Sequence, residues 1–226
     1  MNDYLDSQHR FHQKLYDAEN VESWVFRVYG RVFRDEFGLD GTHGERMLDF
    51  GCGQGAAVRF FTNKGFDAYG VDISVPDIQY AQSIGPASNF QVIPAKPEPS
   101  DMWFGGNFDL VVSIQTLYLL NPTDLHTRLE SLHAMMKPGG LIYASMMGPG
   151  HHYYSRSEDA GNGMRVVNFS SKRLTVKDYH VTFTHSEEEL LHTFRMFKRK
   201  QVGYYDLKYR EDEGGSFHYT YVGQKE

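Results

Sequence analysis

The sequence is poor in cysteine, because Cys52 is the one thiol among 226 residues. A single cysteine excludes an internal disulfide and a metal site built from several cysteines. Histidines and carboxylates also do not recur at metal-ligand spacings. The sequence therefore predicts no metal centre. No basic residue lies near Cys52 in the sequence, so we expect it to fill space rather than act as a nucleophile.

Long apolar runs are missing as well. No stretch approaches the roughly 18–20 apolar residues that a membrane-spanning helix needs. Residues 1–14, MNDYLDSQHRFHQK, are polar and lack the apolar stretch of a signal peptide. We therefore expect a soluble, cytoplasmic protein. The formal charge of −6 argues against a surface that wraps nucleic acid, because such a surface needs clustered lysine and arginine.

Aromatic residues, by contrast, are plentiful, with 16 Phe and 15 Tyr. They suggest a site or an interface that uses flat rings. The apolar fraction of 40% and the length of 226 residues suit one globular domain that needs no disulfide or metal for stability.

From Arg46 onward, short apolar runs alternate with helical patterns. The run FDLVVSI is nearly all apolar, which is typical of a strand covered on both faces. The alternation favours a parallel sheet with right-handed crossovers. The predicted strands are 46–50, 67–73, 89–95, 108–114 and 141–147, and the predicted helices are 55–64, 75–84 and 124–137.

The two ends of the chain have other patterns. Residues 21–37 place apolar side chains at spacings of three and four, which predicts an amphipathic helix. Arg27, Arg31 and Arg34 form its solvated face, or one of them, or Tyr29, folds over a ligand. After the fifth strand we expect a long loop at 148–172, an extended segment at 174–183, a helix at 185–200 and an antiparallel hairpin of 201–210 with 216–224.

Glycines cluster where the first predicted strand ends, in LDFGCGQG. Gly51 and Gly53 let the backbone approach a ligand at the carboxyl end of a parallel sheet. Asp72 stands nineteen residues beyond Gly53, at the end of the second strand, where a carboxylate accepts hydrogen bonds from both hydroxyls of a ribose. The pattern also fits a dinucleotide site, but Asp49 suits a ligand that carries an ammonium better than a pyrophosphate.

Four segments in order carry a family resemblance: LDFGCGQG, GVDIS, FDLVVSIQTL and MKPGGLIYAS, over residues 45–147. Together they resemble the class I, Rossmann-like S-adenosylmethionine-dependent methyltransferases. The resemblance implies a three-layer α/β/α sandwich whose mostly parallel seven-stranded sheet ends in an antiparallel hairpin. It also implies S-adenosyl-L-methionine as cofactor and S-adenosyl-L-homocysteine as product.

The resemblance implies a position for each part of the cofactor. The methionine end lies at Asp49, Gly51, Cys52 and Gly53, and the ribose at Asp72. Ile73 packs on the adenine, and Ser113, Ile114 and Gln115 border the point of methyl transfer. The chain departs from the family after the third strand, where Ala95 and Lys96 replace an acidic residue that faces the adenine. Asp101 or a backbone group takes over that contact.

The acceptor side is predicted from residues that follow the fourth and fifth strands. His151 and His152 are the candidate general bases, because imidazole titrates near neutral pH; the alternative is a polar loop that holds two histidines by chance. Gln115, Tyr118 and Tyr153 are candidate substrate-binding residues. The remaining histidines considered are expected to be structural or exposed: His180, His185, His192 and His218.

We predict one methyltransferase domain with four parts. These are an N-terminal helical cap (1–44), a cofactor-binding core (45–147), a substrate insertion (148–185) and a C-terminal helix with the hairpin (186–226). The expected reaction moves a methyl group to an O or N atom of a small polar molecule, such as a sugar or an amine, by in-line displacement. A nicotinamide-dependent oxidoreductase and a non-catalytic cofactor-binding partner subunit are the alternatives. The sequence leaves the oligomeric state open.

Overall fold

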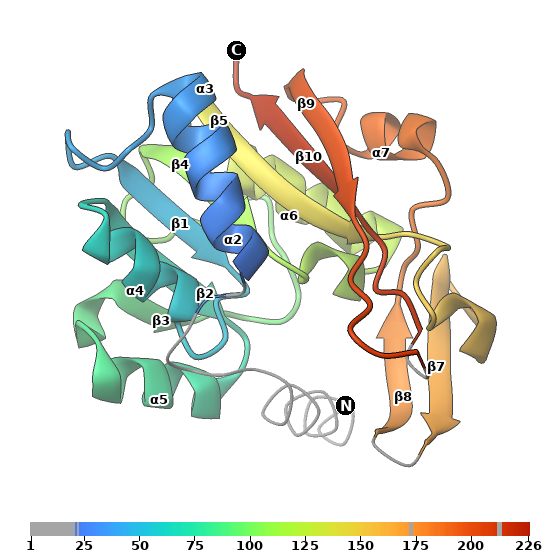
Figure 1. Cartoon of the computed structure of the whole chain (residues 1–226). Coiled ribbons are helices and arrows are strands. Elements are labelled where there is room, and N and C mark those ends of the chain that lie inside the picture. The colour runs from blue at the N-terminus through green and yellow to red at the C-terminus, as the bar shows by residue number, and fades with distance from the viewer. Residues whose placement is uncertain (1–20, 22, 172–173, 212–213) are drawn as a thin grey trace.

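A seven-stranded sheet forms the centre of the computed structural model, which describes residues 21, 23–171, 174–211 and 214–226 (Figure 1). The strand order is β3-β2-β1-β4-β5-β10-β9. All neighbours pair in parallel except β10, which runs antiparallel to both β5 and β9. The predicted α/β fold with a terminal antiparallel hairpin is confirmed. Residues 1–20 of the predicted N-terminal cap lie outside the described residues.

Strands and helices alternate through the core as the sequence predicts. The strands of the central sheet are β1 (Arg46–Phe50), β2 (Asp67–Asp72), β3 (Phe90–Val92), β4 (Phe108–Ser113), β5 (Met136–Met147), β9 (Lys198–Tyr205) and β10 (His218–Gln224). The α-helices are α2 (Ser23–Val28), α3 (Asp35–Phe37), α4 (Ala56–Asn63), α5 (Val75–Ile84), α6 (Pro122–Met135) and α7 (Glu187–Thr193). A π-helix, η1 (Tyr29–Arg34), joins α2 to α3, and short 3-10 turns are η2 (Ala87–Asn89), η3 (Leu117–Leu119) and η4 (Tyr154–Arg156).

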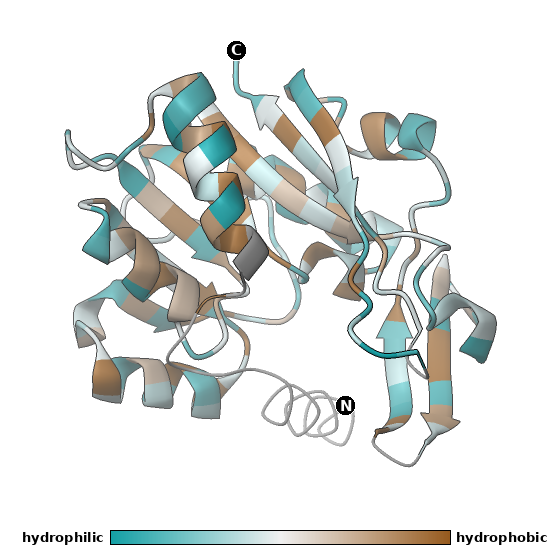
Figure 2. Cartoon of the chain, in the orientation of Figure 1, coloured by the Kyte–Doolittle hydropathy of each residue, from teal (hydrophilic) through white to brown (hydrophobic). Residues whose placement is uncertain are grey.

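Both faces of the sheet are covered, which explains its apolar strands. Successive strand residues point to opposite faces, so Met47 packs with α2, η1, α4 and α5, whereas Leu48 packs with α6 and α7. Figure 2 shows the hydrophobic residues along the strands and on the inward sides of the helices. No helix in the described part of the chain is both long and apolar enough to cross a membrane.

The predicted long loop at 148–172 is wrong, because about half of it forms two strands. β6 (Ser157–Gly161) and β7 (Met164–Ser170) pair with β8 (Thr175–Val181) in a separate antiparallel sheet. Asn162 and the glycines on either side of it all have positive φ, between 53° and 78°, so they make the tight turn between β6 and β7. The glycine-rich composition marked this turn rather than a loop.

The predicted helix at 185–200 is too long. α7 ends at Thr193, and β9 already begins at Lys198. Pairing with β10 fixes this boundary, since Lys198 lies opposite Gln224 and Tyr205 lies opposite His218. β9 also ends earlier than predicted, at Tyr205 instead of residue 210, and β10 begins at His218 instead of residue 216. Both hairpin strands are thus shorter than predicted, and the segment that connects them is longer.

One pole of the molecule collects the carboxyl ends of β1, β2, β4 and β5. The antiparallel register brings the start of β10 to the same pole, because His218 pairs with Met147 at the end of β5. Tyr205, the last residue of β9, lies opposite His218. The small sheet of β6, β7 and β8 lies beyond the end of β5 at this pole (Figure 1).

A buried ion pair ties α6 to the segment before β4. The guanidinium of Arg128, whose side chain is 1% exposed, donates to Asp101 Oδ2 at 2.7 Å. Its Cζ lies 5.1 Å from the ring centre of Phe50 and 4.9 Å from that of Trp103. Burial lowers the pKa of Arg128 and Asp101 opposes that shift. The predicted adenine contact of Asp101 is thus replaced by an ion pair within the core.

Replacing Asp101 by Asn leaves a buried guanidinium without its countercharge. We expect the free energy of unfolding to fall by about 3 kcal/mol, measured by urea denaturation. Asp35→Asn is the matched control, because the Arg34–Asp35 pair is about half exposed on both sides and water screens it, so its loss should change the free energy of unfolding far less. Equal losses in the two variants would contradict this account of the core.

Candidate active site

The glycine loop after β1 is held over the end of β2 by backbone hydrogen bonds. The N–H groups of Gly51 and Cys52 both donate to Val71 O, at 2.8 and 3.1 Å. The next N–H, that of Gly53, donates to Asp72 Oδ2 at 2.8 Å. The sequence places two strands side by side, and these bonds fix the loop between their carboxyl ends.

Gly51 and Gly53 are required for different reasons. Both have positive φ, 81° and 50°. A Cβ at Gly51 would lie 2.2 Å from the side chain of Thr116, whose hydroxyl donates to Ile114 O at 3.0 Å. A Cβ at Gly53 would meet nothing within 4 Å. Gly51 therefore lets two loops pack together, whereas Gly53 faces open space that a ligand suits.

Two carboxylates flank this loop. Asp72 also accepts from Ser74 N–H at 2.8 Å, and burial raises its pKa. Asp49 is 3% exposed, and burial, with a smaller contribution from Asp72, raises its pKa to about 8. Within the described residues, no donor makes a hydrogen bond to the Asp49 carboxylate. An ammonium placed there would stabilise the ionised carboxylate, so the site fits an amino-acid ligand end.

The glycine loop buries Cys52 against β2. Its side chain is 8% exposed, and burial raises the pKa of the thiol well above its usual range. A Cβ at Gly70 would lie 2.7 Å from the sulfur, so β2 needs glycine there. This agrees with a space-filling role for Cys52.

An exposed apolar surface lies beside the loop. Ile73 is 41% exposed although it directly follows a buried strand. Ile93 N–H donates to Asp72 O at 2.9 Å, so the segment that continues to the exposed Ala95 leaves the sheet beside β2. A flat apolar base suits this surface, and Lys96 offers no carboxylate to it.

Polar groups after β4 join the glycine loop to the other half of the pole. Ser113 is fully buried and donates to Phe50 O at 3.2 Å, and Ile114 is half-buried against the α2 and α4 face. Gln115 adopts positive φ, 54°, which is unusual for a residue with a side chain. Its N–H donates to the buried Ser145 Oγ at 2.8 Å, and its Nε2 donates to Tyr205 OH at 3.1 Å.

The predicted histidine pair differs in tautomer. His151 Nδ1 accepts from Tyr153 N–H at 3.1 Å, so the neutral ring carries its proton on Nε2. His152 Nδ1 lies 3.0 Å from Gly215 O, so it donates and the lone pair is on Nε2. Burial, and then the neighbouring histidines, lower the pKa of His151 to about 2. Because its Nδ1 lone pair already accepts from Tyr153 N–H, His151 is disfavoured as a general base.

The remaining predicted acceptor residues lie in an aromatic cluster. Tyr153 is 6% exposed and its ring contacts those of His151, His152, Phe169 and Tyr179. Tyr118 is 2% exposed and its ring centre lies 5.6 Å from that of His218. Sequence patterns did not single out Thr116, Ser145 or Tyr205, and they predicted His218 to be structural or exposed. These residues reach this pole through strand register or loop packing.

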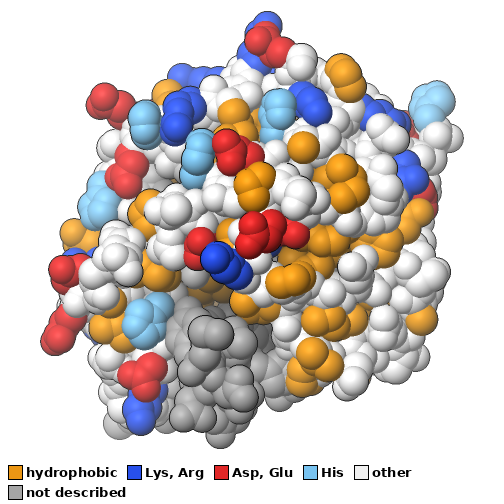
Figure 3. Space-filling model, turned by 180° about the vertical axis from the view of Figure 1, so that it is seen from behind, with side chains coloured by type: hydrophobic (Ala, Val, Ile, Leu, Met, Phe, Trp, Pro, Cys, Tyr) orange, Lys and Arg blue, Asp and Glu red, His pale blue; other side chains and the backbone are white. Residues whose placement is uncertain are grey.

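The helix at 21–37 contributes packing rather than a ligand contact at Tyr29. Its ring is buried among Phe60, Phe61 and Phe66, and its hydroxyl donates to Asp40 O at 3.1 Å. Arg27, Arg31 and Arg34 are exposed, as predicted for a solvated face. Seen from behind, positive and negative side chains are scattered among one another (Figure 3).

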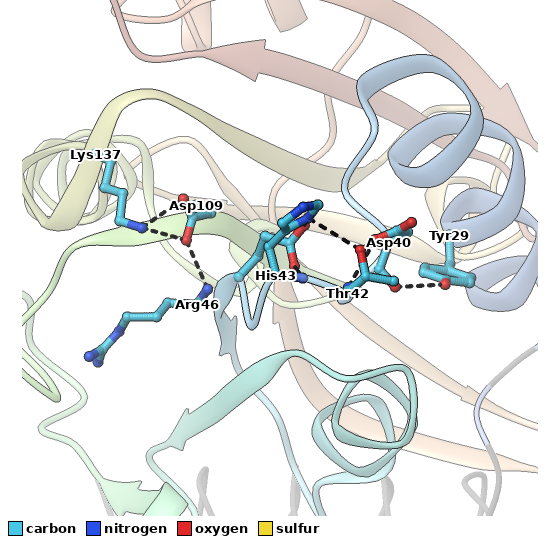
Figure 4. Close-up of polar contacts among 8 residues, drawn as sticks. Tyr29, Asp40, Thr42, His43, Arg46, Asp109 and Lys137 are labelled. Carbon is cyan, nitrogen blue, oxygen red and sulfur yellow. Dashed lines mark hydrogen bonds and ion pairs between the residues drawn. The ribbon is translucent and has the colours of Figure 1, made fainter.

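Within the described residues, one group has the geometry to ligate a metal: Asp40, His43 and Glu45. It lies before β1, at the pole opposite the glycine loop (Figure 4). Asp40 Oδ1 already accepts from Thr42 N–H and its hydroxyl, at 2.9 and 2.6 Å. His43 N–H donates to Glu45 Oε2 at 3.2 Å. These hydrogen bonds form a turn, and the turn explains why the three side chains lie close together.

Comparison with known proteins defines the class of this fold and site. Residues 14–197 match the model of a family described as a methyltransferase domain. The fold resembles a SAM-dependent methyltransferase from Methanosarcina mazei, at 16% identity and a TM-score of 0.68, covering 91% of this chain and 98% of that one. This chain belongs to the methyltransferase domain family, as a class I S-adenosylmethionine-dependent methyltransferase.

Two further relatives carry more specific names. A ubiquinone biosynthesis O-methyltransferase from Nitrobacter winogradskyi is 30% identical over 104 residues, 46% of this chain and 39% of that protein. The first curated relatives are thus matched over less than half of their length. A 1,6-didemethyltoxoflavin-N1-methyltransferase from Burkholderia thailandensis, solved with its substrate and S-adenosylhomocysteine, has a TM-score of 0.62 at 19% identity, covering 99% of this chain and 86% of that one.

Asp72→Ala should weaken the binding of S-adenosylhomocysteine. Loss of hydrogen bonds to a charged group costs roughly 1.5–3 kcal/mol, so Kd should rise about ten-fold or more, measured by calorimetry. Asp67→Ala is the control, because Asp67 begins the same strand and its side chain is 43% exposed. An unchanged Kd for Asp72→Ala would remove this carboxylate from the nucleoside site.

Gly53→Val should abolish that binding by filling the open space above the loop. Gly105→Val is a matched control, since Gly105 also has positive φ (73°) and open surroundings but lies in an exposed turn. Both variants bear a similar backbone strain, so their melting temperatures should fall alike. If Gly53→Val binds S-adenosylhomocysteine as tightly as Gly105→Val, the loop is not the binding site.

Proposed function

We propose that this methyltransferase transfers the methyl group of S-adenosylmethionine to an O or N atom of a small polar molecule. The observation that carries the proposal is the junction after β4. Thr116 packs against Gly51 of the glycine loop, and its neighbour Gln115 bonds to Tyr205 in the aromatic cluster. A cofactor at the loop therefore lies beside Gln115 and the aromatic cluster that Gln115 contacts through Tyr205.

Asp49, Gly51, Cys52 and Gly53 are proposed to hold the methionine end, and Asp72 the ribose. Ile73 and Ala95 are proposed to contact the adenine, and Ser113 and Ile114 to support the floor of the site. Gln115, Tyr118 and Tyr153 are the proposed acceptor residues, with β6 to β8 as the flanking substrate segment. The names of relatives, which include an O-methyltransferase and an N-methyltransferase, support a small acceptor.

The bound cofactor supplies an activated methyl group, so the chain has mainly to position two reactants. Well-oriented reactants gain roughly 7–11 kcal/mol from proximity. Gln115 is held at both its backbone and its side chain, and such rigidity suits alignment of an acceptor with the methyl group. Membership of the methyltransferase family removes the oxidoreductase alternative. Turnover distinguishes an active enzyme from a non-catalytic partner subunit.

S-adenosylhomocysteine should stabilise the protein, whereas NAD should not. At a ligand concentration of 100 times Kd, binding adds about 2.7 kcal/mol to the free energy of unfolding. For a chain of this size that corresponds to a rise of roughly 5–10 °C in melting temperature, measured by scanning fluorimetry. A rise with NAD alone, or with neither ligand, would contradict the proposed function.

A further inference from the structure

His218 carries a buried nitrogen that has no hydrogen-bond partner. The side chain is 2% exposed, and Nε2 contacts no donor or acceptor within the described residues. Most buried polar atoms in proteins are paired, and leaving one unpaired costs free energy. An orphaned nitrogen at the functional pole therefore points to a partner that a ligand brings.

The tautomer of His218 shows what that partner must be. Nδ1 lies 3.0 Å from Ser216 O, and a carbonyl oxygen only accepts, so Nδ1 carries the proton. Nε2 of the neutral ring is then a lone pair, which requires a donor. Burial keeps this ring neutral, because it lowers the pKa of His218 to about 4.

Aromatic rings pack around the His218 ring, and one of them, Tyr205, is hydrogen-bonded to Gln115. The His218 ring is stacked on that of Tyr205, with centres 4.9 Å apart and planes at 18°. Tyr118 and His151 lie 5.6 and 5.3 Å from it, centre to centre. Since Tyr205 OH accepts from Gln115 Nε2, His218 is one ring away from the proposed point of methyl transfer.

Both histidines of the predicted pair are further along the chain of ring contacts from Gln115 than His218 is. The His151 ring contacts that of His218, but its Nδ1 lone pair already accepts from Tyr153 N–H. The His152 ring stacks on that of His151, with ring centres 4.7 Å apart. The contacts run in the order Gln115, Tyr205, His218, His151, His152.

We propose that His218 Nε2 binds a hydroxyl group on a planar acceptor and takes its proton during methyl transfer. The inference rests on the proposed function and makes the reaction an O-methylation. The acceptor oxygen forms a bond to the methyl carbon as the sulfonium–carbon bond breaks, which leaves neutral S-adenosylhomocysteine. The hydroxyl proton moves to Nε2 and then to water. The surrounding rings must part to admit the acceptor, as pockets that close around a ligand do.

The first experiment needs no knowledge of the natural acceptor. Nitrogen-15 NMR of the full chain, saturated with S-adenosylhomocysteine, follows the imidazole of His218 while catechol is added. We expect the Nε2 resonance to shift with catechol and not with 1,2-dimethoxybenzene, which has the same shape but no hydroxyl to donate. No shift with catechol, or equal shifts with both, would overturn the inference. Failure of S-adenosylhomocysteine to bind would instead contradict the proposed function.

The second experiment uses the first acceptor found to be methylated from carbon-13-labelled S-adenosylmethionine. In His218→Asn, the amide nitrogen can replace Nδ1 as the donor to Ser216 O, but no atom replaces the lone pair of Nε2. In His218→Gln, the amide oxygen can replace Nε2 as an acceptor, but it cannot take a proton. We expect His218→Gln to lose about 10²–10⁴-fold in kcat with a KM near that of the parent. His218→Asn should lose both kcat and affinity for the acceptor.

Controls separate this role from a structural one. Both variants must bind S-adenosylhomocysteine with the parent affinity, and His192→Gln, at an exposed position on α7, should keep the parent kcat. An N-linked methyl product, or a larger loss in His152→Gln than in His218→Gln, would overturn the inference and leave the proposed methyl transfer standing.

Discussion

The hydrogen bond from Gly53 N–H to Asp72 is the constraint on which the functional pole depends. It joins a loop after β1 to the last residue of β2, and the same carboxylate accepts from Ser74 at the start of α5. Three elements are thus fixed by one side chain. Because Val71 O also holds the two preceding N–H groups, the loop has little freedom before a ligand binds. Such preorganisation lowers the entropy cost of binding.

Several polar groups at this pole lack a partner or adopt an unusual backbone. Within the described residues, no donor bonds to the Asp49 carboxylate and His218 Nε2 has no partner, and Gln115 adopts positive φ. Away from the pole, the buried charge of Arg128 is paired with Asp101 and packed between aromatic rings. The countercharge makes Arg128 part of the fold, whereas we infer that the groups at the pole are completed by a ligand.

Local patterns predicted the core of the fold well. The alternation of apolar runs and helical patterns predicted the succession of strands and helices along the chain. The glycine cluster and the position of Asp72 after the second strand predicted the loop and the carboxylate that lie side by side. Some boundaries before residue 148 were off by a few residues, since β5 begins at Met136 whereas the predicted helix ran to 137 and the strand began at 141. The larger errors lie after residue 148, where composition resembled a loop but Asn162 and its flanking glycines form a hairpin turn. The boundary between α7 and β9 was also misjudged, because pairing with β10 overrides the helical pattern of the segment.

The sequence alone determined where the tight turn after β1 forms, since glycine is the residue that readily adopts its positive φ. It also determined the family, through four motifs in register. Tertiary structure decided which side chains surround the acceptor. Tyr205 and His218 are far from Gln115 in the chain and have no motif of their own. Only the antiparallel register of β10 between β5 and β9 brings them to the same pole, and such long-range pairing leaves no local signal in the sequence.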